Sequence, residues 1–189
     1  MKTFNLTGSK RESTGKKAAK AYRNESLVPC VIYGGGEVVH FTVNKENIRK
    51  LVYTPEVFIV DLSIEEKKYT AILKDMQFHP VSDALLHADF LQIFKDKPVV
   101  MEIPIQLEGL AQGVKDGGKL SMNMRKLKVK GLYKDFPEKL VINIENLGLG
   151  KTIQVGNLSF DNLELMNVKE SVIAAVQLTR AARGMASKG

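Results

Sequence analysis

The sequence carries an apolar, β-prone run, Leu27-Val28-Pro29-Cys30-Val31-Ile32-Tyr33, that ends at three glycines, Gly34-Gly35-Gly36. Valine, isoleucine and tyrosine favour strands, and consecutive glycines allow the tight reversal that follows a strand. Residues 38–43 then alternate weakly between apolar and polar side chains. We therefore expect a strand over residues 27–33 and a second strand that returns from the glycine turn.

Further short strands are expected on the C-terminal side of this hairpin. Apolar runs predict them at residues 57–62, 69–73, 88–94, 99–105, 126–130, 140–144 and 172–176. A helix is expected over residues 45–52, because Asn44 is a good N-cap and Ile48, Leu51 and Val52 recur at helical spacing. The predicted fold class is mainly β with a few short helices.

The domain organisation follows from a polar stretch, Lys95-Asp96-Lys97-Pro98, that suits a linker. We expect an N-terminal domain over residues 1–94 and a second β-rich domain over residues 95–178. Residues 179–189 are small and basic without an apolar period, so a flexible tail is predicted there. A chain of 189 residues, 44% of them hydrophobic, is large enough to bury two small cores.

Composition also favours a cytoplasmic protein. No run approaches the ~20 apolar residues that cross a bilayer, and the N-terminus lacks the apolar core and cleavage site of a signal peptide. Cys30 is the single cysteine, so an intrachain disulfide is excluded and a reducing compartment is favoured. Within its apolar run, Cys30 is expected to be a buried, inert thiol.

The charge balance indicates a polyanionic partner. Lys and Arg number 28 against 21 Asp and Glu, a net charge of +7. Residues 1–30 alone contain seven basic and two acidic side chains, a local surplus of five. Such a surplus lowers the free energy of approach to phosphates, which favours a nucleic acid contacted near the N-terminus.

Residues 10–23 form the most basic segment, and Gly15 permits a turn within it. The basic residues around this turn are Lys10, Arg11, Lys16, Lys17, Lys20 and Arg23. If residues 16–23 are helical, Lys16, Lys20 and Arg23 share one face at i, i+4 and i+7. Cations at this spacing can follow successive phosphates, and Arg23 can clamp one bidentately. The alternative is a basic helix face that only meets solvent.

A second group of polar side chains comprises Gln77, His79, His87 and Asp89. Two histidines and a carboxylate form some metal sites, but the spacing matches no helical zinc motif and lacks an evident fourth ligand. An acid–base pair would lack a partnered nucleophile. Short planar hydrogen-bonding side chains suit base edges and ribose hydroxyls, which RNA offers in its wide, shallow minor groove. The alternative is a purely structural role for these four side chains. Tyr33, at the end of the expected strand, also has two possible roles: it either stacks on a base or caps the core.

Two glycine-rich segments do not match nucleotide-binding motifs. Residues 148–152 resemble the end of a P-loop, but Glu145 stands where that pattern needs a glycine. Residues 109–120 lack the following helical pattern of a dinucleotide site, and we expect them to form an exposed loop.

Four motifs occur in order: Arg11 with Gly15-Lys16, the run Val28 to Gly35, Gln77-Phe78-His79-Pro80, and His87-Ala88-Asp89-Phe90. Together they resemble the L twenty-five family of bacterial large-subunit ribosomal proteins, which bind 5S ribosomal RNA and whose long form is the general stress protein CTC. The likeness continues at Pro104-Ile105, Gly109, Ala111, Gly113-Val114, Gly117-Gly118 and Pro137-Glu138. It covers about residues 3–176, and the order of the motifs is more specific than any one of them.

The resemblance implies a non-enzymatic structural component of the large subunit. Its N-terminal domain would be a small β-barrel that docks on an irregular internal loop of 5S RNA, and its β-rich C-terminal domain would lie on the subunit surface. It implies 5S RNA and other large-subunit components as partners, a monomer when free, and no cofactor, metal or membrane. The residues implied or expected to face RNA are Arg11, Lys16, Lys17, Lys20, Arg23, Tyr33, Gln77, His79, His87 and Asp89. The chain departs from the family pattern at Tyr22, where the tyrosine replaces a leucine and either alters packing or adds a stacking face.

Other functions remain open from sequence. One is a stress-related or transfer-RNA-binding module outside the ribosome, which co-sedimentation with ribosomes in high salt would exclude. Another is a metal-assisted hydrolase that uses His79, His87 and Asp89, which a metal assay would test. A third is a protein-interaction role for residues 95–178.

Overall fold

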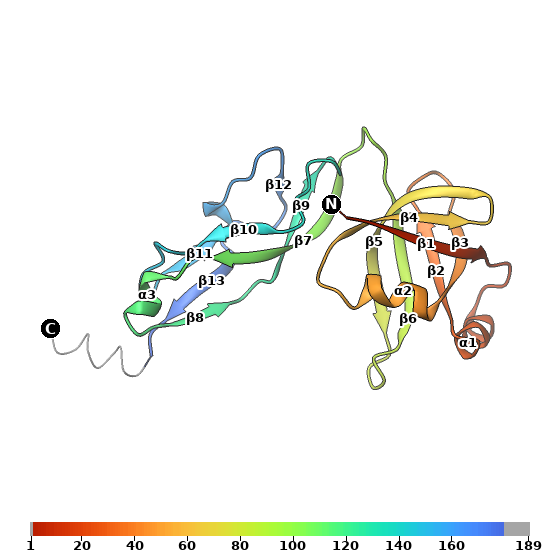
Figure 1. Ribbon diagram of the computed structural model, residues 1–189, viewed down its shortest axis with the longest axis horizontal. Coiled ribbons are helices and arrows are strands. Elements are labelled where there is room, and N and C mark those ends of the chain that lie inside the picture. Colours follow the sequence, from red (N-terminus) through yellow and green to blue (C-terminus); the bar gives the residue numbers. More distant parts are fainter. Residues whose placement is uncertain (1, 180–189) are drawn as a thin grey trace. The chain divides into compact units, whose positions relative to one another are not determined.

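The computed structural model describes residues 2–179, and the chain divides into two compact units, Met1–Lys97 and Pro98–Gly189. The division falls within the polar stretch of residues 95–98. Both units are built mainly from strands, with few and short helices (Figure 1). The predicted fold class is therefore confirmed.

The N-terminal unit is a closed six-stranded barrel with the strand order β1-β3-β2-β6-β5-β4. Strand β1 pairs in parallel with β4, and β2 pairs in parallel with β6, whereas the other neighbours are antiparallel. Closure leaves no unpaired sheet edge in this unit. The strands are β1 (Lys2–Lys10), β2 (Leu27–Tyr33), β3 (Val39–Asn44), β4 (Phe58–Ile64), β5 (Lys67–Phe78) and β6 (Leu85–Gln92).

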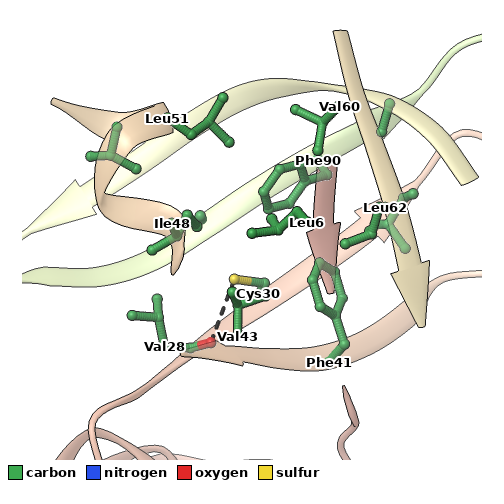
Figure 2. Close-up of a cluster of buried hydrophobic side chains, with 14 of the residues drawn as sticks. Leu6, Val28, Cys30, Phe41, Val43, Ile48, Leu51, Val60, Leu62 and Phe90 are labelled. Carbon is green, nitrogen blue, oxygen red and sulfur yellow. Dashed lines mark hydrogen bonds between the residues drawn. The ribbon is translucent and has the colours of Figure 1, made fainter. Parts of the chain in front are cut away.

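Alternation along the strands separates the barrel core from its outer surface. In β2, Val28, Cys30 and Ile32 are buried, whereas Val31 and Tyr33 between and after them are only partly covered. The inward side chains form one apolar cluster, which includes the tilted ring pair Phe41 and Phe90, 5.7 Å apart (Figure 2). Burial in this cluster raises the pKa of the Cys30 thiol to about 12, which keeps it neutral and confirms the expected buried thiol.

Two helices flank the barrel strands. Helix α1 (Lys16–Asn24) follows Gly15, whose φ of 100° only glycine adopts readily. Helix α2 (Lys45–Val52) begins as predicted, because the Asn44 side chain accepts a hydrogen bond of 2.9 Å from the Glu46 backbone N–H. Its buried residues, Ile48, Leu51 and Val52, are those expected from helical spacing and pack into the barrel core (Figure 2).

The C-terminal unit contains two small sheets, ordered β10-β7-β9-β12 and β11-β13-β8. Its elements are β7 (Val99–Glu108), α3 (Gln112–Lys115), β8 (Lys119–Met122), β9 (Lys126–Gly131), β10 (Leu140–Asn143), β11 (Thr152–Gln154), η1 (Val155–Asn157), β12 (Glu164–Leu165) and β13 (Val172–Gln177). The predicted tail begins at Thr179, and its residues 180–189 lie outside the described residues. In the described part of the chain, every helix is too short or too polar to span a membrane.

One strand was missed from the sequence, and one expectation about local structure was wrong. No element was predicted for residues 2–10, yet β1 closes the barrel by pairing with both β3 and β4. The exposed loop expected at residues 109–120 instead contains helix α3, and a Cβ added at the buried Gly113 would meet the Gly148 carbonyl carbon at 2.5 Å. The glycine therefore allows close packing of two backbone segments.

Candidate nucleic-acid interface

Helix α1 presents Lys16, Lys17 and Lys20 to solvent, a set called here the α1 lysines. Ala18 and Ala19 on the other side are half-buried, and the helix packs against β2. Within residues 2–179 none of the three lysines has an ion-pair partner. Three cations without local compensation therefore stand on one side of the helix.

The N-terminus of α1 concentrates this positive charge. Its first turn contains Lys16 and Lys17 and no acidic residue, and Gly15 supplies no side-chain cap. The helix dipole already places a partial positive charge there, so cations at this end cost about 0.3–1 kcal/mol each. A bound anion would remove the conflict, because helix N-termini bind phosphate through their free N–H groups and dipole. An unfavourable placement of cations at the positive end of a helix dipole is the kind of local cost that proteins retain at functional sites.

The β5–β6 hairpin gathers Gln77, His79, His87 and Asp89, called here the hairpin group. The strand register places Gln77 directly opposite His87. His87 and Asp89 are two residues apart on β6 and are both half-buried on the outer side of the barrel. The buried Ala88 between them points to the core. Pairing of β5 with β6 thus brings three of the four side chains together.

His87 and Asp89 are joined by a short hydrogen bond, with 2.7 Å between Nδ1 of His87 and Oδ1 of Asp89. Because a carboxylate can only accept, the histidine carries a proton on Nδ1 and donates it. This bond fixes the ring orientation and leaves Nε2 for another partner. In its neutral form His87 therefore offers an acceptor at Nε2, and in its protonated form a donor.

His79 lies in the loop that joins β5 to β6. Its Nδ1 accepts hydrogen bonds from the backbone N–H groups of Val81 and Ser82, both at 3.3 Å. Its backbone pairs across the loop with Ala84 and Asp83. A neutral His79 therefore carries its proton on Nε2, where it remains a donor. The residue shapes the loop as well as exposing a polar edge.

The side-chain arrangement does not build the metal site that sequence left open. His87 is committed to Asp89, and the Nδ1 of His79 is used by the loop backbone. No group of three or more His, Cys, Asp or Glu side chains in the described residues could hold a metal ion.

Arg23 links the helix to the hairpin. Its Nη1 donates a hydrogen bond of 3.1 Å to the carbonyl oxygen of Leu86, the residue before His87. Sequence spacing placed Arg23 on one solvent stripe with Lys16 and Lys20, but its side chain is half-buried and turns toward the barrel. The bond therefore ties the C-terminal end of α1 to the strand that carries His87 and Asp89.

Arg11 also lies closer to the barrel than expected. Its backbone N–H donates to the His40 carbonyl at 2.9 Å, and its guanidinium carbon lies 6.0 Å from the centre of the Tyr22 ring. That distance is at the outer limit of a cation–π contact. The Nε atom is buried and has no hydrogen-bond partner among residues 2–179. The Tyr22 ring therefore lies next to the Arg11 guanidinium.

Tyr33 lies at the end of β2, next to Leu91 of β6. Burial, and then the negative charges of Asp89 and Asp75, raise the pKa of its hydroxyl above the usual value. The hydroxyl therefore stays protonated at neutral pH. Val31 pairs with Asp89, and Tyr33 follows Val31 by two residues on β2, so Tyr33 is on the same outer side of the barrel as Asp89.

Two polar residues on this surface were not singled out from sequence. Asp75 pairs with Asp89 across β5 and β6, and His40 pairs with Val31 across β3 and β2. Val31 in turn neighbours Asp89. His40, Val31, Asp89 and Asp75 thus form a row across β3, β2, β6 and β5, which only the strand register reveals. The one signal in the sequence was the polar side of residues 38–43, which includes His40.

Comparisons with known proteins agree over both units. Residues 6–90 match the Ribosomal L25p family, and residues 98–180 match the family described as ribosomal protein TL5, C-terminal domain. The division between the two matches falls between residues 90 and 98.

Several relatives match from end to end. The large ribosomal subunit protein bL25 of Azobacteroides pseudotrichonymphae is 69% identical over 189 residues, and 100% of each chain is covered. The bL25 protein of Parabacteroides distasonis is 61% identical over 194 residues, again with 100% of each chain covered. That of Porphyromonas gingivalis strain W83 is 59% identical over 190 residues, covering 100% of this chain and 99% of the relative.

Identity at this level over the full length establishes the family and, with it, the function class. The family consists of structural ribosomal proteins and not of enzymes, so the hydrolase alternative is excluded. The chain belongs to the bL25 family of large ribosomal subunit proteins, in its two-domain form, and its place is the ribosome of the cytoplasm.

Proposed function

We propose that this ribosomal protein binds 5S ribosomal RNA through one outer surface of its N-terminal barrel. The surface combines helix α1 with the hairpin group on β5 and β6. The observation that carries the proposal is the hydrogen bond from Arg23 to the Leu86 carbonyl, which fastens the basic helix beside His87. The proposed contact residues are Arg11, Lys16, Lys17, Lys20, Arg23, Tyr33, Gln77, His79, His87 and Asp89.

The two halves of this surface suit different parts of an RNA. The α1 lysines are exposed and unpaired within the described chain, so they can approach phosphates without breaking an existing ion pair. The hairpin group supplies fixed donors and acceptors, which suit base edges and ribose hydroxyls in a shallow minor groove. The charge of the α1 lysines then provides affinity for any RNA, and the hairpin group distinguishes 5S ribosomal RNA from other RNAs.

The arginines have a second role in this proposal. Arg23 uses one N–H on the barrel, and no other hydrogen bond of its guanidinium is present within residues 2–179. A guanidinium has five N–H donors, so the others can reach a phosphate at the junction of helix and hairpin. Arg11 lies next to the same end of the helix, with its guanidinium carbon 6.0 Å from the centre of the Tyr22 ring. We further propose that the protein acts as a single copy beside other large-subunit components.

Filter binding with purified full-length protein tests the proposal. We expect 5S ribosomal RNA to bind at least ~10-fold more tightly than a scrambled RNA of the same length, because shape and edge contacts add to the phosphate term. Equal affinity for the two RNAs would defeat the proposal.

A further inference from the structure

A pocket of about 680 Å³ opens on the N-terminal barrel between helix α2 and the β5–β6 loop, and it is called here the α2 pocket. This volume lies within the ~300–1,000 Å³ typical of sites for small molecules and cofactors. The residues that line it are Ser26, Lys45, Glu46, Ile48, Arg49, Tyr53, Ser82, Asp83, Ala84 and Leu85. None of them belongs to the proposed contact residues.

Two cations line the α2 pocket, and neither is held in an ion pair within the described residues. Lys45 and Arg49 are one helical turn apart, are exposed, and have no ion-pair partner among residues 2–179. Glu46 and Asp83 also line the pocket. Two carboxylates disfavour a second phosphate but accept hydrogen bonds from the exocyclic amino groups of bases. The charge pattern therefore fits one phosphate with a base beside it.

The pocket also carries an exposed aromatic ring. Tyr53 is 56% exposed, although its hydroxyl donates a hydrogen bond of 2.9 Å to the Asp83 carbonyl. Its ring lies 6.0 Å from that of Phe78, which is 38% exposed. Two adjacent aromatic rings left partly in water are a typical stacking platform for unpaired bases.

The α2 pocket shares the β5–β6 hairpin with the proposed RNA surface. Its Ser82–Leu85 wall belongs to the hairpin that carries Gln77 and His79, and Leu85 directly precedes the Leu86 bound by Arg23. The pocket and the hairpin group are therefore carried by the same two strands and their loop.

We propose that the α2 pocket binds a single unstacked nucleotide of the same RNA, with its base against Tyr53 and its phosphate held by Arg49 and Lys45. The inference rests on the proposed function and adds a second contact site to it. It gives Tyr53 and Arg49 a role in RNA binding in addition to their place in the structure.

Filter binding of full-length variants to 5S ribosomal RNA tests this inference. Tyr53→Leu removes the ring on which the base would stack, and Arg49→Gln removes a cation from the phosphate, so each should weaken binding about 5-fold or more. Tyr53→Phe keeps the ring and loses only the hydroxyl bond, so it should stay near the parent affinity. Lys50→Gln is the matched charge control, because Lys50 is also exposed on α2 but does not line the pocket. Lys20→Gln tests the separate contribution of the α1 lysines. Thermal unfolding of each variant identifies any that fail to fold.

The outcomes separate the two claims. Weaker binding by the pocket variants and by Lys20→Gln, with Lys50→Gln and Tyr53→Phe unchanged, supports the α2 pocket. Full affinity of the pocket variants alongside a loss in Lys20→Gln overturns the pocket and leaves the proposed function standing. The same overturning result, combined with poorer incorporation into large subunits, would assign the pocket to a protein partner. No loss in any variant would overturn both claims.

Discussion

Lysines, and not arginines, form the exposed cationic part of helix α1. Lys20 is exposed and has no ion-pair partner in the described chain, whereas Arg23 donates one hydrogen bond to the Leu86 carbonyl oxygen. Lysine is a flexible point charge, so it suits phosphate contact without fixed geometry. In the proposed interface, the residue that attaches the helix to the barrel and the residues that contact phosphates are therefore different.

Lys20→Ala should weaken binding to any RNA and reduce the salt dependence of affinity. Loss of one phosphate contact lowers the slope of log K against log salt by about 0.7–0.9. Titrations at several salt concentrations measure it. Lys68→Ala, at the opposite end of β5 from Gln77, is the control and should keep the parent slope. An unchanged slope for Lys20→Ala would contradict the phosphate role.

Asp89→Asn should mainly reduce discrimination. Without the carboxylate, the 2.7 Å bond to Nδ1 of His87 loses its charged acceptor and the ring its fixed orientation. We expect the ratio of affinities for 5S RNA and scrambled RNA to fall, while the salt slope stays unchanged. Asp61→Asn, which changes an exposed carboxylate on β4, provides the comparison. A fall in affinity that is equal for both RNAs would mean that Asp89 does not read the RNA.

Cys30 should be chemically silent in the folded protein. Burial raises the pKa of its thiol to about 12, so the reactive thiolate is negligible below pH 9. A thiol reagent at pH 8 should therefore react only after denaturation. Rapid modification of the native protein would show that the barrel opens readily around β2.

At the scale of the element, helix α1 is built against its own dipole. Two lysines occupy its first turn and no carboxylate balances them. The helix is 9 residues long, which is short for independent stability, so packing on β2 and the Arg23 bond must hold it. We propose that these unfavourable charges are retained because they bind an anion.

Lys17→Glu separates stability from binding. A carboxylate at the helix N-terminus should raise the free energy of unfolding by about 0.5–1 kcal/mol, while RNA affinity falls about tenfold or more because a cation is replaced by an anion. Urea denaturation and filter binding measure the two effects. A variant that is more stable and binds equally well would show that the N-terminus of α1 contacts no phosphate.

The elements also show how far the sequence determines the fold. Local signals were sufficient for β2, whose bounds match the apolar run of residues 27–33, and for helix α2 with its Asn44 cap. They were insufficient for β1, because Phe4 and Leu6 are its only large apolar residues and its partners, β3 and β4, lie far along the chain.

The candidate site likewise depends on both local sequence signals and pairing between distant strands. Its residue types were readable from sequence, but their proximity depends on β2 pairing with β6 and on β5 pairing with β6. The inward turn of Arg23 and the row from His40 to Asp75 likewise arise from packing and register between distant segments. Periodicity contains no such information.

At the scale of the whole molecule, two compact units carry separate cores and match separate families. We propose that RNA recognition resides in residues 1–97. A fragment of these residues should bind 5S RNA within about threefold of the full chain, because a closed barrel with its own core is expected to fold independently. Binding that requires residues 98–189 would move part of the interface into the second unit.

The central claim is that helix α1 and the hairpin group form one RNA surface. Titration of isotope-labelled full-length protein with 5S ribosomal RNA, followed by amide chemical shifts, tests it most directly. The account predicts that residues 16–24 and residues 77–89 shift together and saturate at the same RNA concentration. Shifts confined to one of these segments, or saturation at two different concentrations, would contradict it.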